Sequence, residues 1–119
     1  MILFDGFSPV DGTPIYIQIL MFIKRGAIAG AIVDGDELPS RRFLSSLLGI
    51  NPNTVQKAFR LLEEEGLIES RSGAKSYMTL DDNKLKRLRN ELLSEEIHGI
   101  VVSLKQMGIS KEEAISLIK

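Results

Sequence analysis

The stretch SRRFLSSLLGINPNTVQKAFRLLEEEG, residues 40 to 66, predicts two helices joined by a tight turn. Ser40 is a favourable N-cap for the first helix, because its hydroxyl can accept a hydrogen bond from a free amide of the first turn. Gly49 tolerates the left-handed conformation that commonly ends a helix. Asn51 and Pro52 are typical of the cap and first position of a second helix. Two helices that meet at so short a connection form a helix-turn-helix motif.

Both helices carry apolar residues at helical spacing. The first is expected over about residues 40 to 48, and the second ends at Gly66. Such a stripe on each helix predicts a shared core on one side of the motif. The expected core positions are Phe43, Leu44, Leu47 and Leu48 in the first helix and Val55, Ala58, Phe59, Leu61 and Leu62 in the second.

The start of the second helix carries polar side chains that a cap alone does not require. Asn and Gln suit paired hydrogen bonds to adenine, Lys suits guanine or phosphate, and Thr suits phosphate or a thymine methyl. Taken singly, Thr54 can be an ordinary residue of the first helical turn, and Arg41 or Lys75 elsewhere in the motif is better explained as solvated. Their occurrence on one face of a helix-turn-helix motif favours contact with the major groove of DNA. The residues are Asn53, Thr54, Gln56 and Lys57.

Further elements are expected on either side of the motif. Thr13 and Pro14 predict the cap and first residue of a preceding helix, over roughly 14 to 29, and VDGDELP predicts a turn-rich connection. After the motif, LIESR and SYMTL favour strands on either side of SGAK, with Gly73 in the turn. Three helices followed by a two-stranded hairpin constitute a winged helix, which we assign to residues 1 to 80.

Residues 81 to 119 predict a second, helical unit. An apolar seam steps by three and four residues until Gly108, and SKEE at 110 to 113 is a capping box that opens a short last helix. This unit either folds back on the winged helix or pairs with a second copy of itself. The length of the seam favours pairing. The residues expected at a dimer contact are Leu85, Leu88, Leu92, Leu93, Ile97, Ile100, Leu104, Ile115 and Ile118.

The composition excludes several classes of protein. The chain has 119 residues, no cysteine and one histidine, so a disulfide framework or a zinc cluster of cysteine and histidine is not expected. It contains no apolar run long enough to span a membrane and no signal peptide, which predicts a soluble, cytoplasmic protein. Neither paired catalytic carboxylates nor a glycine-rich phosphate loop is recognisable, so we expect neither an enzyme nor a cofactor.

The charge is distributed unevenly along the chain. The formal net charge is −1, but residues 38 to 80 hold six basic and four acidic groups, while residues 1 to 37 are acidic and residues 81 to 119 are balanced. The middle third is therefore the part best suited to a polyanion. Its basic residues are Arg41, Arg42, Lys57, Arg60, Arg71 and Lys75.

The segment LPSRRFLSSLLGINPNTVQKAFRLLEEEGLIESRSG, residues 38 to 73, resembles the DNA-binding domain of the GntR family of bacterial transcription regulators. PIYIQI at 14 to 19 and NPNTV at 51 to 55 are similar to its YtrA-like branch. The sequence departs from the wider family at Pro52 and Gln56, where arginines are common, and at Lys75, where the wing usually has a second glycine.

The resemblance implies a homodimer that binds an inverted-repeat operator and represses transcription, in this branch often of genes for ABC-type transporters. The predicted fold is mostly α with a small β-hairpin, a winged helix-turn-helix followed by a helical dimerisation segment. Its predicted partner is double-stranded DNA, and the sequence names no small-molecule effector. The alternative is a winged helix that docks on another protein. The predicted DNA-binding residues are Arg41, Arg42, Asn53, Thr54, Gln56, Lys57, Arg60, Arg71, Gly73 and Lys75.

Overall fold

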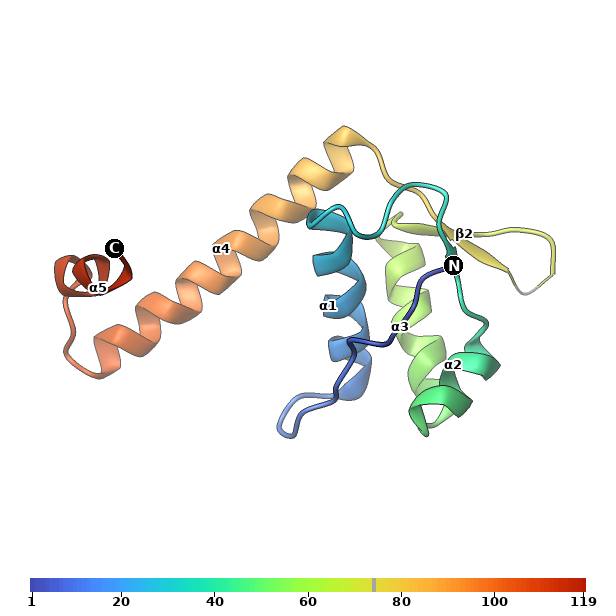
Figure 1. Ribbon diagram of the computed structural model, residues 1–119, viewed down its shortest axis with the longest axis horizontal. Coiled ribbons are helices and arrows are strands. Elements are labelled where there is room, and N and C mark those ends of the chain that lie inside the picture. Colours follow the sequence, from blue (N-terminus) through green and yellow to red (C-terminus); the bar gives the residue numbers. More distant parts are fainter. Residues whose placement is uncertain (74) are drawn as a thin grey trace. The chain divides into compact units, whose positions relative to one another are not determined.

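The computed structural model describes residues 1 to 73 and 75 to 119 (Figure 1). Ala74, in the turn expected between the two hairpin strands, lies outside the described residues. The described chain forms two compact units, Met1–Leu85 and Lys86–Lys119. The expected helical fold with a small winged sheet is confirmed. Its elements are α1 (Ile15–Ile28), β1 (Glu37–Leu38), α2 (Arg41–Leu48), α3 (Pro52–Glu64), β2 (Ile68–Ser70), β3 (Ser76–Met78), α4 (Asp82–Gln106) and α5 (Lys111–Ile118).

The helix-turn-helix motif forms as its caps predict. The Ser40 hydroxyl accepts a hydrogen bond of 3.1 Å from the Phe43 amide at the start of α2, and Gly49 ends α2 with φ +66°. Asn51 Oδ1 accepts from the Asn53 amide at 2.8 Å, which caps α3. These local hydrogen bonds satisfy amides that a helix terminus otherwise leaves unpaired.

The expected apolar face of α2 is partly wrong. Phe43 and Leu47 are exposed, at 53% and 56%, whereas Leu44 is fully buried. Ser45 is also buried, because its hydroxyl donates a hydrogen bond of 2.6 Å to the Ile50 carbonyl in the turn. A helix of only eight residues buries a narrow stripe, and here a hydrogen-bonded serine occupies part of that stripe in place of leucine.

Helix α1 lies alongside α3 and shares its core (Figure 1). Ile19 and Ile23 of α1 are fully buried, as are Val55 and Leu62 of α3. The expected cap at Thr13 is wrong. Pro14 is the N-cap, and the helix has no side-chain cap because proline has no side-chain acceptor; its carbonyl accepts the first intrahelical hydrogen bonds.

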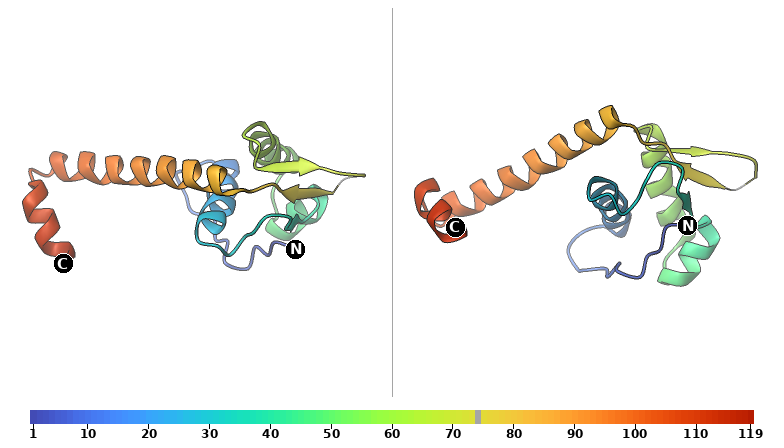
Figure 2. Two further views of the ribbon diagram at one scale, coloured as in Figure 1. Left: turned by 90° about the horizontal axis from the view of Figure 1, so that it is seen from above. Right: turned by 45° about the horizontal axis from the view of Figure 1, so that its top comes forward.

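The sheet has three antiparallel strands in the order β1-β3-β2 (Figure 2). The expected hairpin is β2 and β3, which the Arg71 amide and the Lys75 carbonyl close with a hydrogen bond of 2.9 Å. The connection VDGDELP contributes β1, where the sequence predicted only turns. Two residues are too few to show an alternating pattern, and Glu37 and Leu38 become a strand through pairing with Tyr77 and Ser76.

The first turn of α4 is attached to the end of α3. The Lys84 ammonium donates hydrogen bonds to the carbonyl oxygens of Gly66, at 2.7 Å, and Thr79, at 3.2 Å. Asp81 Oδ1 accepts from the Lys84 amide at 2.7 Å. A cation on carbonyls just beyond a helix C-terminus also opposes the negative end of the helix dipole. Residues 81 to 84 thus fasten the end of α3 to the end of β3.

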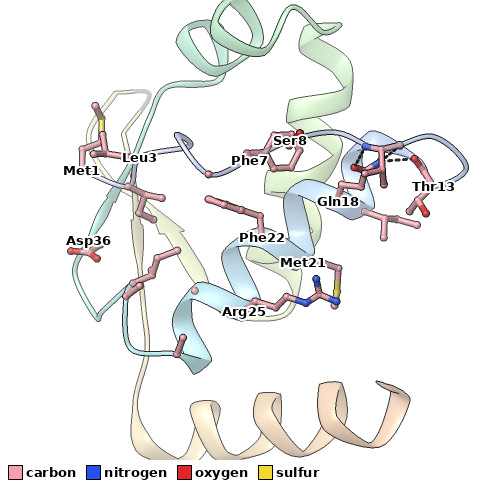
Figure 3. Close-up of a pocket in the computed structure, with 18 residues that line it drawn as sticks. Met1, Leu3, Phe7, Ser8, Thr13, Gln18, Met21, Phe22, Arg25 and Asp36 are labelled. Atoms are coloured by element: carbon pink, nitrogen blue, oxygen red, sulfur yellow. Dashed lines mark hydrogen bonds between the residues drawn. The ribbon is translucent and has the colours of Figure 1, made fainter. Parts of the chain in front are cut away.

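The N-terminal segment crosses α1 and leaves an apolar cleft of about 920 Å³ between them (Figure 3). One end of the segment is held by the Ile2 amide on the Glu37 carbonyl, at 2.8 Å. At the other end the Gln18 side chain bonds both backbone groups of Val10 and the Thr13 carbonyl. The segment is therefore fixed at two points, to β1 at one end and to α1 at the other.

In the second unit, residues 86 to 106 continue α4, and α5 follows. Gly108 takes φ +71° after α4, and the Ser110 hydroxyl accepts from the Glu113 amide at 3.1 Å, as the capping box predicts. Leu93, Ile97 and Ile100 are about half exposed. No helix of the described residues is long and apolar enough to cross a membrane.

Candidate nucleic-acid interface

The first two turns of α3 have an apolar side and a polar side. Val55, Ala58 and Phe59 are buried against the rest of the helical core. The polar residues expected at the DNA contact lie on the outside, with three exposed and Thr54 partly so. The exposed residues are Asn53, Gln56 and Lys57.

The start of α3 is also electrostatically suited to an anion. Its first turn contains no acidic residue, and Pro52 at the first position leaves one fewer amide to pair. The partial positive charge of a helix N-terminus is therefore not neutralised within that turn. Because Pro52 has no amide and the Asn53 and Thr54 amides are both bonded to Asn51, a phosphate or a base edge would meet side-chain donors there, with no carboxylate in the turn.

The two arginines that open α2 lie in different surroundings. Arg42 is exposed and lies within the first turn of α2. Arg41 is half-buried, with its guanidinium carbon 5.2 Å from the centroid of the Phe59 ring. Its Nε is buried and has no hydrogen-bond partner among the described residues. Arg41 therefore packs on the core with part of its guanidinium, whereas Arg42 is free of that constraint.

Lys57 lies over an aromatic ring. Its ammonium is 4.0 Å from the centroid of Tyr16, a half-buried residue in the first turn of α1. Nothing in the sequence around Tyr16 predicts this contact. The two residues are far apart in the sequence, so only the packing of α1 on α3 brings them together. The segment PIYIQI, residues 14 to 19, contains this tyrosine, but it indicates only a resemblance to the YtrA-like branch and no role for Tyr16.

The wing presents Arg71 in a pre-formed cluster. Its guanidinium contacts Glu69 Oε1 through Nη2 at 2.7 Å and Nε at 2.8 Å, and it lies 4.5 Å from the centroid of Tyr77. Glu69 and Tyr77 are direct cross-strand partners, so the pairing of β2 with β3 places both beside the arginine. Gly73 and Lys75, which flank the tip, are exposed.

Arg60 lies further along α3 and is also exposed. Its Nε is 3.9 Å from Glu64, one turn later on the same helix. An ion pair this long between exposed side chains is weak, and it leaves the arginine available to another anion. Among the residues that the structure describes, no group of three or more His, Asp or Glu side chains is placed to hold a metal ion.

A capped helix with an exposed polar tip, a preceding helix that opens with arginines and a basic hairpin together define a winged helix-turn-helix protein of the DNA-binding class. Comparison with known proteins agrees. Residues 15–77 match the family described as "Bacterial regulatory proteins, gntR family". The chain belongs to the GntR family and is a DNA-binding transcription regulator.

Two curated relatives match almost the whole chain. The HTH-type transcriptional repressor YtrA of Bacillus subtilis is 33% identical over 113 residues, which are 94% of this chain and 87% of YtrA. The HTH-type regulator YhcF of the same organism is 32% identical over 106 residues, 89% of this chain and 88% of YhcF. A GntR family regulator from Listeria monocytogenes superposes with a TM-score of 0.82 at 32% identity, covering 92% of this chain and 96% of that one.

Proposed function

We propose that the protein is a transcriptional repressor that binds an inverted-repeat operator as a homodimer. In this proposal α3 enters the major groove, Arg42 contacts the flanking backbone or a base edge, and the wing contacts phosphate or the minor groove. Residues 1 to 80 are the DNA-binding domain and residues 81 to 119 the dimerisation segment. The proposed contact residues are Arg41, Arg42, Asn53, Thr54, Gln56, Lys57, Arg60, Arg71, Gly73 and Lys75.

The exposed polar tip of α3 carries this proposal. Asn53, Gln56 and Lys57 are exposed side by side on a helix whose first turn holds no acidic residue. A surface built to dock on a protein would instead present aromatic or aliphatic anchors at its centre. The alternative of a winged helix that binds only another protein is therefore less well supported at this face.

The homodimer is proposed from the apolar surface of the second unit. Leu93, Ile97 and Ile100 follow each other along α4 and are each about half exposed in the single chain. Ile115 and Ile118 of α5 are exposed as well, whereas Leu88 and Leu92 are buried. An apolar stripe at this spacing is typical of helix pairing, so the proposed contact is centred on the exposed members of the seam.

The direction of regulation is proposed from a relative. YtrA is named a transcriptional repressor, and the present chain is similar to it over 94% of its length. We extend repression to this chain on that basis. The resemblance to the YtrA-like branch further suggests genes for ABC-type transporters as targets.

The test is selection of bound duplexes from a random double-stranded DNA pool by the purified full chain, followed by sequencing. A two-fold symmetric motif is expected, and Arg42→Ala and Lys57→Ala variants that retain their helical circular dichroism should fail to enrich it. On the selected duplex, log affinity should fall with log salt by about 0.9 per phosphate contact. Absence of any motif from the folded protein, or affinity unchanged between about 50 and 200 mM salt, would contradict the proposal.

A further inference from the structure

Lys57 is the one proposed DNA-contacting lysine of α3, and its position is set by a ring rather than by a carboxylate. Its ammonium lies 4.0 Å from the Tyr16 centroid, within the range of a cation–π contact. No carboxylate of the described residues forms an ion pair with it. The ring is therefore the identified electrostatic partner of this lysine in the described part of the chain.

The Tyr16 ring is a fixed platform. Tyr16 lies in the first turn of α1, and the fully buried Ile19 and Ile23 hold that helix against α3. At the other end of α1, Lys24 forms an ion pair of 2.9 Å with Glu65, and the Lys24 side chain is only 13% exposed. The placement of the ring thus depends on contacts that do not involve Lys57.

A lysine held by an aromatic ring keeps more of its charge and of its N–H donors for a ligand than a lysine paired with a carboxylate. The ring attracts the cation through its quadrupole without cancelling the full charge, and the three N–H donors of an ammonium can still reach phosphate or guanine. A lysine without such a platform samples many rotamers, and ordering them opposes binding. The contact with Tyr16 removes part of that disorder before DNA arrives.

The same arrangement recurs across the candidate interface. The described residues contain three cation–π contacts, and the cation in each is a proposed DNA-contacting residue: Arg41, Lys57 or Arg71. The chain has two tyrosines, Tyr16 and Tyr77, and both serve as such platforms. Tyr77 shares its arginine with Glu69, so of the two tyrosines Tyr16 is the one whose cation has no paired acid among the described residues.

We propose that Tyr16 is a positioning residue for DNA binding, which orients the Lys57 ammonium toward the major groove. The inference rests on the proposed role of α3 at the operator. It assigns to α1 a part in recognition that does not require Tyr16 itself to touch DNA. The chemistry predicts that the ring matters and that the phenolic hydroxyl does not.

A double-mutant cycle on the selected operator separates these roles. Tyr16→Phe keeps the ring, Tyr16→Leu removes it, and Lys57→Met removes the charge at similar length. Fluorescence anisotropy should show Tyr16→Phe binding like the wild type and Tyr16→Leu binding roughly two- to five-fold more weakly. At low salt, where phosphate contacts are strongest and the weaker Lys57→Met variant can still be titrated, Tyr16→Leu should have no further effect in the Lys57→Met background.

Two further readouts distinguish positioning from simple structural damage. Tyr16→Leu retains the lysine charge, so its salt slope should equal that of the wild type, whereas Lys57→Met should lower the slope by about 0.9. In the free protein, the ε-methylene protons of Lys57 should resonate upfield because of the ring current. That displacement should persist in Tyr16→Phe and vanish in Tyr16→Leu.

The contrary outcomes are distinct. If Tyr16→Phe binds DNA as weakly as Tyr16→Leu, the hydroxyl makes its own contact. If Tyr16→Leu weakens binding just as much in the Lys57→Met background, the ring acts independently of Lys57. Either result overturns the proposal. If Lys57→Met binds the operator with wild-type affinity, Lys57 is not a DNA contact and the proposal is overturned as well. Lack of operator binding by the wild-type chain would instead refute the proposed function itself.

Discussion

Glu69 is the acidic side chain in direct contact with Arg71, the wing arginine that we propose as a DNA contact. Its carboxylate lies 2.7 Å from Arg71 Nη2, and both side chains are about half exposed. Phosphate must compete with that carboxylate for the guanidinium. The same carboxylate keeps Arg71 on the Tyr77 ring. The ion pair should therefore lower the affinity of Arg71 for phosphate while it holds the guanidinium in a defined position.

Substitution of Glu69 by Gln should therefore strengthen DNA binding. The affinity for DNA should rise roughly two- to five-fold at low salt, a small gain because the exposed ion pair that is lost is itself weak. The gain should shrink as salt rises, because salt screens the extra net positive charge. Anisotropy titrations on operator and on random duplex measure it, with Glu95→Gln in the second unit as a charge-matched control. Equal or weaker binding by Glu69→Gln would mean that the pair is required to present Arg71.

At the level of single side chains, the sequence predicted residue types better than their partners. The polar tip of α3 was identifiable because Asn53, Thr54, Gln56 and Lys57 are consecutive or nearly so. The contact between Lys57 and Tyr16 could not be identified from the sequence, because it depends on how α1 packs on α3. Local hydrogen bonds leave a signature in neighbouring residues, whereas contacts between helices leave none that one sequence reveals.

At the level of elements, the turn between α2 and α3 depends on one glycine. Gly49 has φ +66°, in the left-handed region, and no heavy atom lies within 4 Å of where its Cβ would stand. The cost of any substitution there is consequently one of backbone conformation rather than of packing.

Gly49→Ala should lower the free energy of unfolding by about 1–2 kcal/mol, the cost of a left-handed conformation for a residue with a side chain. Gly49→Asn should cost less, because asparagine tolerates this region. Urea unfolding followed by circular dichroism measures both. An alanine variant as stable as the wild type would show that the turn can end α2 in another conformation.

The elements themselves were predictable where their ends carry chemical signals. Ser40, Asn51 and Ser110 cap helices as expected, since each side chain bonds an amide two or three residues away. The buried positions of α2 were less predictable. Phe43 is exposed, and Ser45 is buried, where its hydroxyl bonds a carbonyl beyond the end of the helix. β1 was missed because a two-residue strand is defined by its partner strand.

At the level of the whole molecule, dimerisation through the second unit remains a proposal with a direct test. Leu93→Glu combined with Ile100→Glu should give monomers, because two carboxylates would be buried in the proposed contact. Light scattering measures the mass. Val102→Glu is the matched control, since Val102 lies nine residues, or about 180° around an ideal helix, from Leu93. A dimer in the double variant would place the interface elsewhere.

The packing of α1 on α3 restricts the lengths of both helices. Tyr16 meets Lys57 near one end and Lys24 meets Glu65 near the other, so each helix has the same interval between its two contacts. A single residue inserted or deleted within either interval would turn the following residues by about 100° and break one contact. Substitutions there have local effects, but a change of length uncouples Lys57, a proposed DNA contact, from the ion pair at the far end. Length variation among related chains should accordingly fall in the connections and spare these two intervals.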